Sequence, residues 1–479
     1  MAHNGGGERE HAAVPPPPGK RPREDALLDV PVKRPRGETP PAGKQPAEAA
    51  EPLSPGKQPC ADADDAALSA GQRRAVALAA AGRSLALLGP AGTGKSFAVR
   101  RIRDALAAAH GAARVVVTAS TGAAAFLVGG RTLHSFAGTG VGDAARFGIM
   151  FACATRGDAA ARWAGAAALI VDEISMVDAA YLDLLDRVAR RNRGSRRPFG
   201  GLQVIVVGDF AQLAPIDGAH AFTAQCWDAL FGASTVVLTE VFRQRDPAFV
   251  AALHALRTAS LDGAQRALLA ACSRPVAHAV KLFARNADAD AHNQREFARL
   301  PGPETTYAAI DVLHGLRAPD FPVGAKVALR VGARVMLRAN VSVEDGLVNG
   351  ACGVVAALGR HAVAVDFDSG RRVDIQRARF TADVPRGDGT PRECVRVQIP
   401  LILAWAISIH KSQGATLARC EVDLRRAWAA GQVYVALSRA ATREGLCVHN
   451  LERAAIVASA EVLRFYAAAR EAADAAPPE

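Results

Sequence analysis

A glycine-rich segment between an apolar run and a helical pattern constrains the fold of this chain more than any other feature. The segment GPAGTGKS (89–96) directly follows the run SLALL and precedes FAVRRIRDAL, whose apolar residues recur at helical spacing. A strand that enters a helix through such a loop points successive backbone N–H groups and the helix N-terminus at one place. We therefore predict a phosphate-binding loop at the carboxyl end of a strand.

Further apolar runs alternate with helical patterns from Ser69 onward, which predicts an α/β fold. Runs that are apolar throughout, joined by helical crossovers, favour a parallel sheet that is covered on both faces. We predict strands over 85–88, 115–118, 168–171, 204–207 and 236–238, with helices over 96–109 and 179–191. A second set follows, with a helix over 287–300 and strands over 281–284, 334–337, 421–423, 433–438 and 446–448.

The stretch between Gly350 and Val397 has a different pattern. Three runs in it alternate apolar and polar residues and are separated by glycine-rich turns, which is typical of antiparallel strands with one solvated face. We interpret this stretch as a small antiparallel barrel inserted into a second α/β domain. The three runs cover 362–367, 372–375 and 393–398.

The predicted domain boundaries follow these changes of pattern. They are 1–64 for an N-terminal tail, 65–260 for the first α/β domain, 261–345 with 399–470 for the second, 346–398 for the barrel, and 471–479 for a frayed end.

The first 64 residues hold 13 of the 27 prolines and almost no aromatic or β-branched residues. Such a segment cannot bury enough apolar surface to offset its chain entropy, so we expect it to be disordered. Two basic clusters, KRPR at 20–23 and KRPR at 33–36, are separated by nine residues. This spacing fits a nuclear import receptor and predicts a nuclear protein, although a solvating basic tail is the alternative. A mitochondrial presequence is less favoured, because the first 19 residues contain acidic residues and consecutive glycines.

Composition narrows the class of protein. The net charge is +11 and resides on residues 65–479, which favours a polyanionic partner. No run approaches the ~18–20 apolar residues that a membrane span needs, and no early apolar segment resembles a secretion signal. The eight cysteines form no CxxC pair, so neither a zinc ribbon nor a disulfide framework is expected.

The phosphate-binding loop and an acidic pair together predict a hydrolysis site. We expect Lys95 to reach the β- and γ-phosphates and the Ser96 hydroxyl to bind Mg²⁺. The apolar run 169–171 delivers Asp172 to the carboxyl edge of the sheet, where it can also hold Mg²⁺. Glu173 is placed to polarise the attacking water. The predicted cofactors are ATP and Mg²⁺.

Three further residues are candidates to respond to the γ-phosphate. Gln212 lies in the loop GDFAQ after the run 204–207, where Asp209 could face a metal-bound water. Arg243 and Arg439 are candidates to neutralise charge on the γ-phosphate, an effect worth roughly 10³–10⁵ in rate. Because Arg439 comes from the second domain, hydrolysis would depend on closure between the domains.

Nine segments, taken in order, resemble the PIF-type (petite integration frequency) helicases of superfamily one, which are related to RecD-like helicases. The stretch from Glu173 to Leu213 is similar to a signature of this family that RecD-like proteins generally lack. The matching segments are LSAGQ (68–72), GPAGTGKS (89–96), VTASTGAAAFLVGGRTLHSFAGTGVG (117–142), LIVDEISMVDAAYLDLLDRVAR (169–190), PFGGLQVIVVGDFAQLAPI (198–216), LTEVFRQRD (238–246), LVNGACGVV (347–355), LAWAISIHKSQGATL (403–417) and GQVYVALSRA (431–440).

The resemblance implies an α/β fold with two RecA-like P-loop domains and a small wedge insertion at about 134–167. It implies ATP-dependent, 5′-to-3′ unwinding of DNA duplexes, RNA–DNA hybrids or G-quadruplexes in repair, recombination and telomere maintenance. The expected partners are single-stranded, forked or structured DNA and an import receptor, with a monomeric motor and no membrane. It also implies that Gln72 contacts adenine, and that the cofactor-binding residues are Gln72, Gly89, Pro90, Ala91, Gly92, Thr93, Gly94, Lys95, Ser96 and Gly414.

Residues for a DNA strand are expected after one strand end in each domain. Short hydroxyl and backbone donors suit phosphates, and aromatic rings suit bases. His134 and Phe136 are candidates to stack on bases, with ordinary packing beneath the loop as the alternative. The phosphate contacts are expected from Ser120, Thr121 and Gly122 in the first domain and from His410, Lys411, Ser412 and Thr416 in the second.

Two other functions stay open at this point. The same motor could act on RNA or on RNA–DNA hybrids, because a sequence does not place contacts to the 2′-hydroxyl. The chain could also be an ATP-gated clamp on single strands that does not unwind processively. A pure binder need not keep both Arg243 and Arg439, which argues against the clamp.

Overall fold

The computed structural model describes residues 68–121, 124–125, 128–139, 147–215, 218–315, 318, 321–339, 341–342, 347, 350–385 and 391–474. The predicted tail with its two basic clusters, Gly122 and residues 475–479 of the expected frayed end lie outside the described residues.

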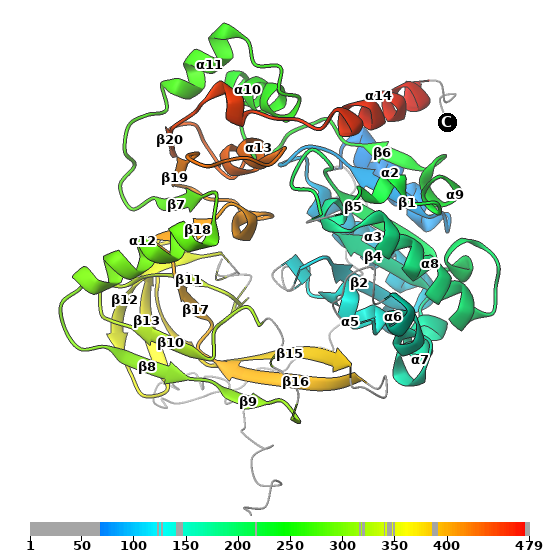
Figure 1. Cartoon of the computed structure of the whole chain (residues 1–479), viewed down its shortest axis with the longest axis horizontal. Helices are drawn as coiled ribbons and strands as arrows, with labels where there is room; N and C mark the ends of the chain where they lie inside the picture. Colours follow the sequence, from blue (N-terminus) through cyan, green and yellow to red (C-terminus); the bar gives the residue numbers. More distant parts are fainter. Residues whose placement is uncertain are drawn as a thin grey trace, which may run out of the picture. The chain divides into compact units, whose positions relative to one another are not determined.

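The first α/β half is built on a six-stranded parallel sheet (Figure 1). All five strands predicted from apolar runs form, each within one residue of the expected bounds. The fully buried runs in the middle of the sheet explain this agreement, because each strand needs apolar side chains on both faces. The order is β3 (Arg131–Thr132), β2 (Val115–Ala119), β4 (Ala168–Asp172), β5 (Gln203–Gly208), β1 (Leu85–Leu88) and β6 (Thr235–Val237).

Helices cover both faces of this sheet. On one face, α2 (Ala70–Ala80) and α3 (Lys95–His110) pack through residues such as Ala75 and Ile102 on Leu87. On the other face, Leu182 of α8 (Ala179–Arg193) packs with Leu169. The same side carries α5 (Leu133–Ala137), α6 (Phe147–Ala154), α7 (Gly157–Gly165) and α9 (Trp227–Phe231), of which α5 to α7 fill the expected wedge region.

The second α/β half has a four-stranded parallel sheet (Figure 1). Its order is β18 (Ala406–Ser408), β7 (Val280–Phe283), β19 (Cys420–Asp423) and β20 (Leu446–His449). The helices of this half are α10 (Pro247–Arg257), α11 (Gly263–Ala270), α12 (Asn286–Arg299) and α13 (Gln432–Leu437).

One predicted strand of this half is wrong, and another forms but belongs to a different sheet. The run 433–438 forms α13, in which every residue is buried, so the apolar run carries no helical stripe that a sequence pattern could detect. The run 334–337 is a strand, but it pairs antiparallel with its neighbours and leaves the parallel sheet.

Antiparallel sheets separate β7 and α12 from β18. One is a five-stranded sheet, another is a long hairpin with one added strand, and a third has two strands. The insertion therefore begins before residue 346, and its closure into a barrel stays a prediction. The strand order in the five-stranded sheet is β14 (Arg372–Gln376), β13 (Ala362–Phe367), β12 (Cys352–Leu358), β11 (Arg334–Leu337) and β17 (Leu401–Leu403). The hairpin sheet has the order β15 (Ala378–Pro385), β16 (Pro391–Gln398) and β9 (Ile310–Val312). The two-stranded sheet pairs β10 (Lys326–Leu329) with β8 (Thr305–Ala308).

The C-terminal helix α14 (Ala460–Asp474) returns to the first half (Figure 1). Its Val462 and Tyr466 belong to the same core as Phe210 and Trp227. The ring of Phe465 stacks on Phe222 with centroids 4.3 Å apart. Residues that follow the second half in sequence thus complete the core of the first half.

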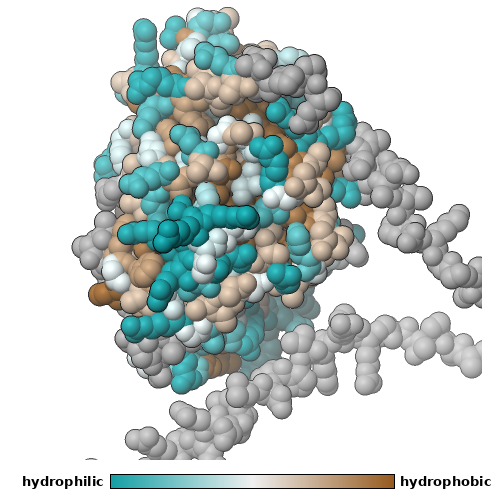
Figure 2. Space-filling model, turned by 90° about the vertical axis from the view of Figure 1, so that its right-hand side faces the viewer, coloured by the Kyte–Doolittle hydropathy of each residue, from teal (hydrophilic) through white to brown (hydrophobic). Residues whose placement is uncertain are grey.

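Figure 2 views the molecule from the side on which α8 and α14 appear in Figure 1, and hydrophilic residues gather across the middle of this face. Arg187 and Arg191 on α8 are exposed. Within the described ranges, no helix combines the length and the apolar character that crossing a membrane would require.

Candidate active site

The phosphate-binding loop joins β1 to α3 and packs tightly on the segment after β6. A Cβ atom on Gly89 would lie 2.7 Å from the carbonyl oxygen of Leu238, and one on Gly92 would lie 2.8 Å from Cβ of Arg243. Both glycines have positive φ values, 152° and 84°, which disfavour any larger residue. The loop therefore brings Arg243 against the site, as expected.

Lys95 lies at the centre of this loop. Its Nζ donates to the carbonyl oxygens of Gly89 at 2.7 Å and of Pro90 at 2.9 Å. Burial lowers the pKa of Lys95, whereas the carboxylates of Asp209, Glu173 and Asp172 act to raise it. An ammonium group that donates only to neutral carbonyls fits an anionic phosphate, which would be a stronger partner.

Gln72 supports the loop from behind. Its Nε2 donates to the carbonyl oxygens of Thr93 at 3.2 Å and Gly94 at 3.4 Å, and its Oε1 accepts from the backbone of Ser69 at 2.9 Å. The side chain is 2% exposed. The Gln72 amide ties the start of α2 to the phosphate-binding loop, and its contact with adenine stays a prediction.

The acidic pair lies where it was predicted, at the end of β4. The Asp172 carboxylate accepts the backbone N–H of Glu173 at 2.8 Å, and Glu173 has a φ of 54°, a strained conformation of the kind that collects at functional sites. Burial, followed by the charge of Glu173, raises the pKa of Asp172 to about 7. Two crowded acids fit a divalent cation, for which Ser96, exposed in the first turn of α3, would be a further oxygen ligand.

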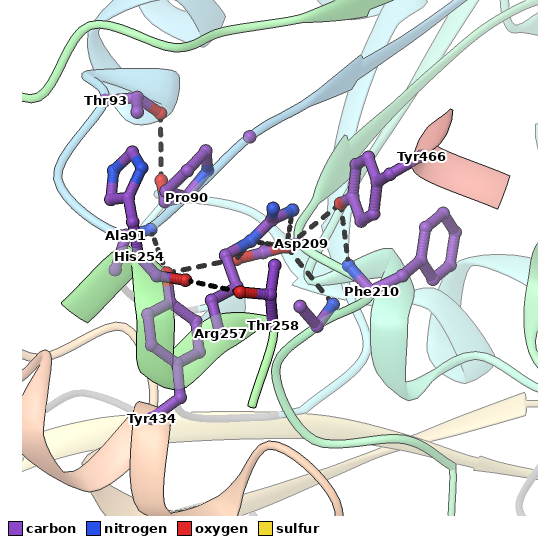
Figure 3. A network of polar contacts seen from close by, with 12 residues as sticks. Pro90, Ala91, Thr93, Asp209, Phe210, His254, Arg257, Thr258, Tyr434 and Tyr466 are labelled. Atoms are coloured by element: carbon purple, nitrogen blue, oxygen red, sulfur yellow. Dashed lines mark hydrogen bonds and ion pairs between the residues drawn. The ribbon is translucent and has the colours of Figure 1, made fainter. Parts of the chain in front are cut away.

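Asp209 contradicts the expectation that it faces a metal-bound water. Its carboxylate is fully buried and accepts hydrogen bonds from three side chains (Figure 3). Arg257 donates from Nη2 at 2.8 Å, Tyr466 from its hydroxyl at 2.9 Å and Tyr434 from its hydroxyl at 3.2 Å. The donors come from α10, α14 and α13, so Asp209 joins these elements and has no free oxygen edge for a metal.

Each tyrosine also accepts a backbone N–H group. Ala91 in the phosphate-binding loop donates to the Tyr434 hydroxyl at 2.8 Å, and Phe210 donates to the Tyr466 hydroxyl at 3.1 Å (Figure 3). Tyr434 from α13 and Tyr466 from α14 therefore both hold the loop that follows β5. It carries Gln212, which is 6% exposed and whose Oε1 has no hydrogen-bond partner among the described residues. A buried acceptor without a partner fits a site that a ligand or its water completes.

The two arginines meet at the boundary between the halves. Arg243 donates to the carbonyl oxygen of Ser438 at 3.1 Å, next to Arg439. Burial, followed by the charge of Arg439, lowers the pKa of Arg243 to about 10, and the charge of Arg243 in turn acts to lower the pKa of Lys95. Arg243 thus lies within electrostatic reach of a cation on either side, Arg439 and Lys95, and such a group of positive charges fits a ligand with several negative charges, such as a triphosphate.

The residues of the first half that were expected to contact a DNA strand lie in different surroundings. Ser120 follows β2, and its Oγ is buried with no partner in the described part of the chain. The Thr121 hydroxyl accepts from the backbone of Ala124 at 3.2 Å. Phe136 is 1% exposed and packs against Trp163. The alternative, ordinary packing beneath the loop, therefore holds for Phe136, and its ring is not available to a base. His134 is stacked on Tyr181 with centroids 4.5 Å apart.

The expected residues of the second half lie on one loop after β18. Lys411 and Thr416 are exposed, and His410 is half-buried. The Ser412 hydroxyl is buried and donates to the carbonyl oxygen of Ile409 at 2.7 Å, so it stabilises the turn of this loop. Gly414 is exposed with a φ of 78°.

Two residues at the site were missed from the sequence. Gln413 Nε2 donates to the Glu173 carboxylate at 2.9 Å, and its position between two nominated residues was the available signal. Phe242 is 49% exposed, and a Cβ on Gly94 would lie 3.6 Å from its ring. An exposed ring at the mouth of the loop suits a nucleobase, but the sequence offered no sign of it.

Family models match two parts of the chain. Residues 68–253 match the model described as PIF1-like helicase, and residues 316–358 match the model described as the 2B domain of DNA helicase Pif1. The ATP-dependent DNA helicase PIF1 of Rattus norvegicus is 39% identical over 420 residues, which cover 84% of this chain and 64% of that protein. The chain thus spans just under two thirds of the length of this curated relative.

Solved structures agree with these matches. The crystal structure of Pif1 helicase from Candida albicans has a TM-score of 0.73 and 35% identity, covering 84% of this chain and 99% of that chain. The structure of Bacteroides sp Pif1 in complex with ADP-AlF4 has a TM-score of 0.70 and 28% identity, covering 84% and 97%.

Proposed function

Because this chain belongs to the PIF1-like helicase family, we propose that it is an ATP-dependent DNA helicase. A solved Bacteroides Pif1 is bound to single-stranded DNA, which supports a DNA strand as the track of the motor. The direction, 5′ to 3′, comes from the family resemblance. RNA–DNA hybrids and G-quadruplexes are further proposed substrates, in repair, recombination and telomere maintenance.

One observation carries the proposal. Arg243 of the first half hydrogen-bonds the backbone beside Arg439 of the second half. The charge of Arg439 acts on Arg243, and the charge of Arg243 acts on Lys95. A change at the phosphate-binding loop therefore acts directly on the contact between the halves. This is the coupling that turns hydrolysis into relative movement of two domains.

The residues divide the chemistry as follows. Lys95, Arg243 and Arg439 would neutralise the triphosphate, and Gln212 would contact the γ-phosphate or its water. Asp172 and Ser96 would hold Mg²⁺, which supplies charge neutralisation between the phosphates when bound. Glu173 would accept the proton of the attacking water.

Unwinding of matched duplexes tests the proposal. Two duplexes of the same sequence carry either a 5′ or a 3′ single-stranded tail, and strand release is followed with ATP. We expect release from the 5′-tailed duplex, loss of release in Lys95→Ala, and ATP hydrolysis that rises strongly with added single strands. Release from the 3′ tail alone would reverse the direction, and strand binding without stimulated hydrolysis would indicate an ATP-gated clamp. Stimulation by RNA but not DNA would indicate an RNA translocase.

We further propose that the protein is nuclear and monomeric. The support for import is the pair of basic clusters at 20–23 and 33–36. Replacing Lys33 and Arg34 by alanine should move a fluorescent fusion of the full chain from the nucleus to the cytoplasm. Sedimentation of the purified protein should give the mass of one chain, 49.9 kDa, and a dimer would contradict the monomer.

A further inference from the structure

The proposed general base is held by a side chain of the other half. Gln413 Nε2 donates to Oε2 of Glu173 at 2.9 Å, and the two residues are 240 positions apart in sequence. The Oε1 atom of Gln413 is buried and has no hydrogen-bond partner among the described residues. An amide with one satisfied and one unsatisfied end is an arrangement that a small rearrangement can improve, because a buried acceptor without a partner costs free energy.

The loop that carries Gln413 also reaches the second arginine. Arg439 Nη1 donates to the carbonyl oxygen of Ala415 at 3.2 Å. In the same loop, Lys411 and Thr416 are exposed, and Gly414 has a φ of 78°, where a change of backbone direction costs little. This short loop therefore connects two exposed residues, which suit a strand phosphate, with both Glu173 and Arg439.

We propose that Gln413 is a positioning residue that latches Glu173 while no strand is bound, and that a single strand seated on residues 410–416 releases the latch. The inference rests on the proposed function, since it assigns the control of the same hydrolysis site. In the latched state the Gln413 amide occupies one carboxylate oxygen of Glu173, so this oxygen is not free to accept a hydrogen bond from the attacking water.

The strength of the contact suits a switch. A single hydrogen bond from an amide to a carboxylate is stronger than one between neutral groups, but it is one contact, and the phosphate contacts of a bound strand can offset its loss. The Asp209 cluster differs, because its buried ion pair with Arg257 is costly to break. The halves would therefore stay joined at Asp209 while the Gln413 contact opens and closes.

The latch makes a reciprocal prediction. If strand binding breaks the contact, removing the contact must tighten strand binding by the factor by which the latch opposed it. In Gln413→Met, which keeps the chain length and removes the donor, we expect turnover without DNA to rise about three- to tenfold. The Kd for a fluorescent oligothymidine, measured by anisotropy without nucleotide, should fall by a similar factor. Stimulation by DNA should shrink accordingly.

Gln413→Asn and Gln376→Ala complete the test. Asparagine keeps the amide but shortens its reach, so Gln413→Asn should change turnover and Kd as Gln413→Met does. Gln376 is exposed on β14, so Gln376→Ala should match the wild type in both. If the wild type is not stimulated by DNA, the proposed function fails and the latch fails with it. If the wild type is stimulated but both Gln413 variants lower turnover with and without DNA, or leave turnover and Kd unchanged, the latch alone is wrong.

Discussion

Arg439 shows how much of the site depends on single side chains with fixed geometry. The guanidinium group is 1% exposed and donates to Val435, Ala415 and Ser438 through all three nitrogens. The hydrogen bonds to Val435 and Ser438 anchor it on α13, and the hydrogen bond to Ala415 reaches the loop 410–416. A lysine would keep the charge but lose this fork.

We therefore expect Arg439→Lys to lower kcat of DNA-stimulated hydrolysis at least about 100-fold, since an arginine of this kind is worth roughly 10³–10⁵. Steady-state kinetics with saturating single strands measures the change. Arg103→Lys is the control and should leave kcat unchanged, because the side chain of Arg103 on α3 is 43% exposed and pairs with Asp104. A loss below about threefold in Arg439→Lys would remove this arginine from the reaction.

His134 provides a prediction about pH. Burial lowers the pKa of His134 to about 4 from 6.5. Between these values the unfolded chain binds a proton that the folded chain does not, so folding stability falls as the pH drops from 6.5 to 4. His134→Phe can keep the stacking on Tyr181 and removes this titration. Urea unfolding at pH 7 and pH 5 should show a smaller loss in the variant, and equal losses would contradict the assignment.

At the scale of elements, the Asp209 cluster joins parts that sequence analysis had no means to connect. Its donors lie at 257, 434 and 466, on three helices. An apolar run locates a strand because the pattern is local, and the end of a strand locates Asp172. Contacts between side chains hundreds of positions apart leave no local pattern, so Asp209 was expected to face a metal-bound water and Tyr434 to lie in a strand.

The Asp209 cluster should contribute strongly to the free energy of unfolding. Asp209→Asn leaves the buried Arg257 without a charged partner, and we expect a loss of about 3–5 kcal/mol in the free energy of unfolding. Denaturant titration measures this loss, with Asp104→Asn on the surface expected to change little. A loss of less than about 1 kcal/mol in Asp209→Asn would show that the pair does not hold α10 and α14 to the first half.

At the scale of the whole molecule, charge should govern binding of the strand. The chain carries a net +11 but has few aromatic residues, 5% of the sequence, and the structure buries Phe136. Phosphate contacts should therefore contribute more than base stacking. Each basic residue that neutralises a phosphate releases a condensed counterion, so the logarithm of the binding constant should fall linearly with the logarithm of salt concentration.

Lys411 is the residue on which this prediction is most direct, because it is exposed on the loop that carries the proposed latch. Removing one phosphate contact from a single strand should reduce the salt slope by about 0.7. Anisotropy titrations of Lys411→Ala over a range of salt concentrations measure the slope, and Arg187→Ala on α8 should leave it unchanged. If Lys411→Ala weakens binding equally at all salt concentrations, the lysine supports the loop without contacting a phosphate. The strand would then act on residues 410–416 through other groups.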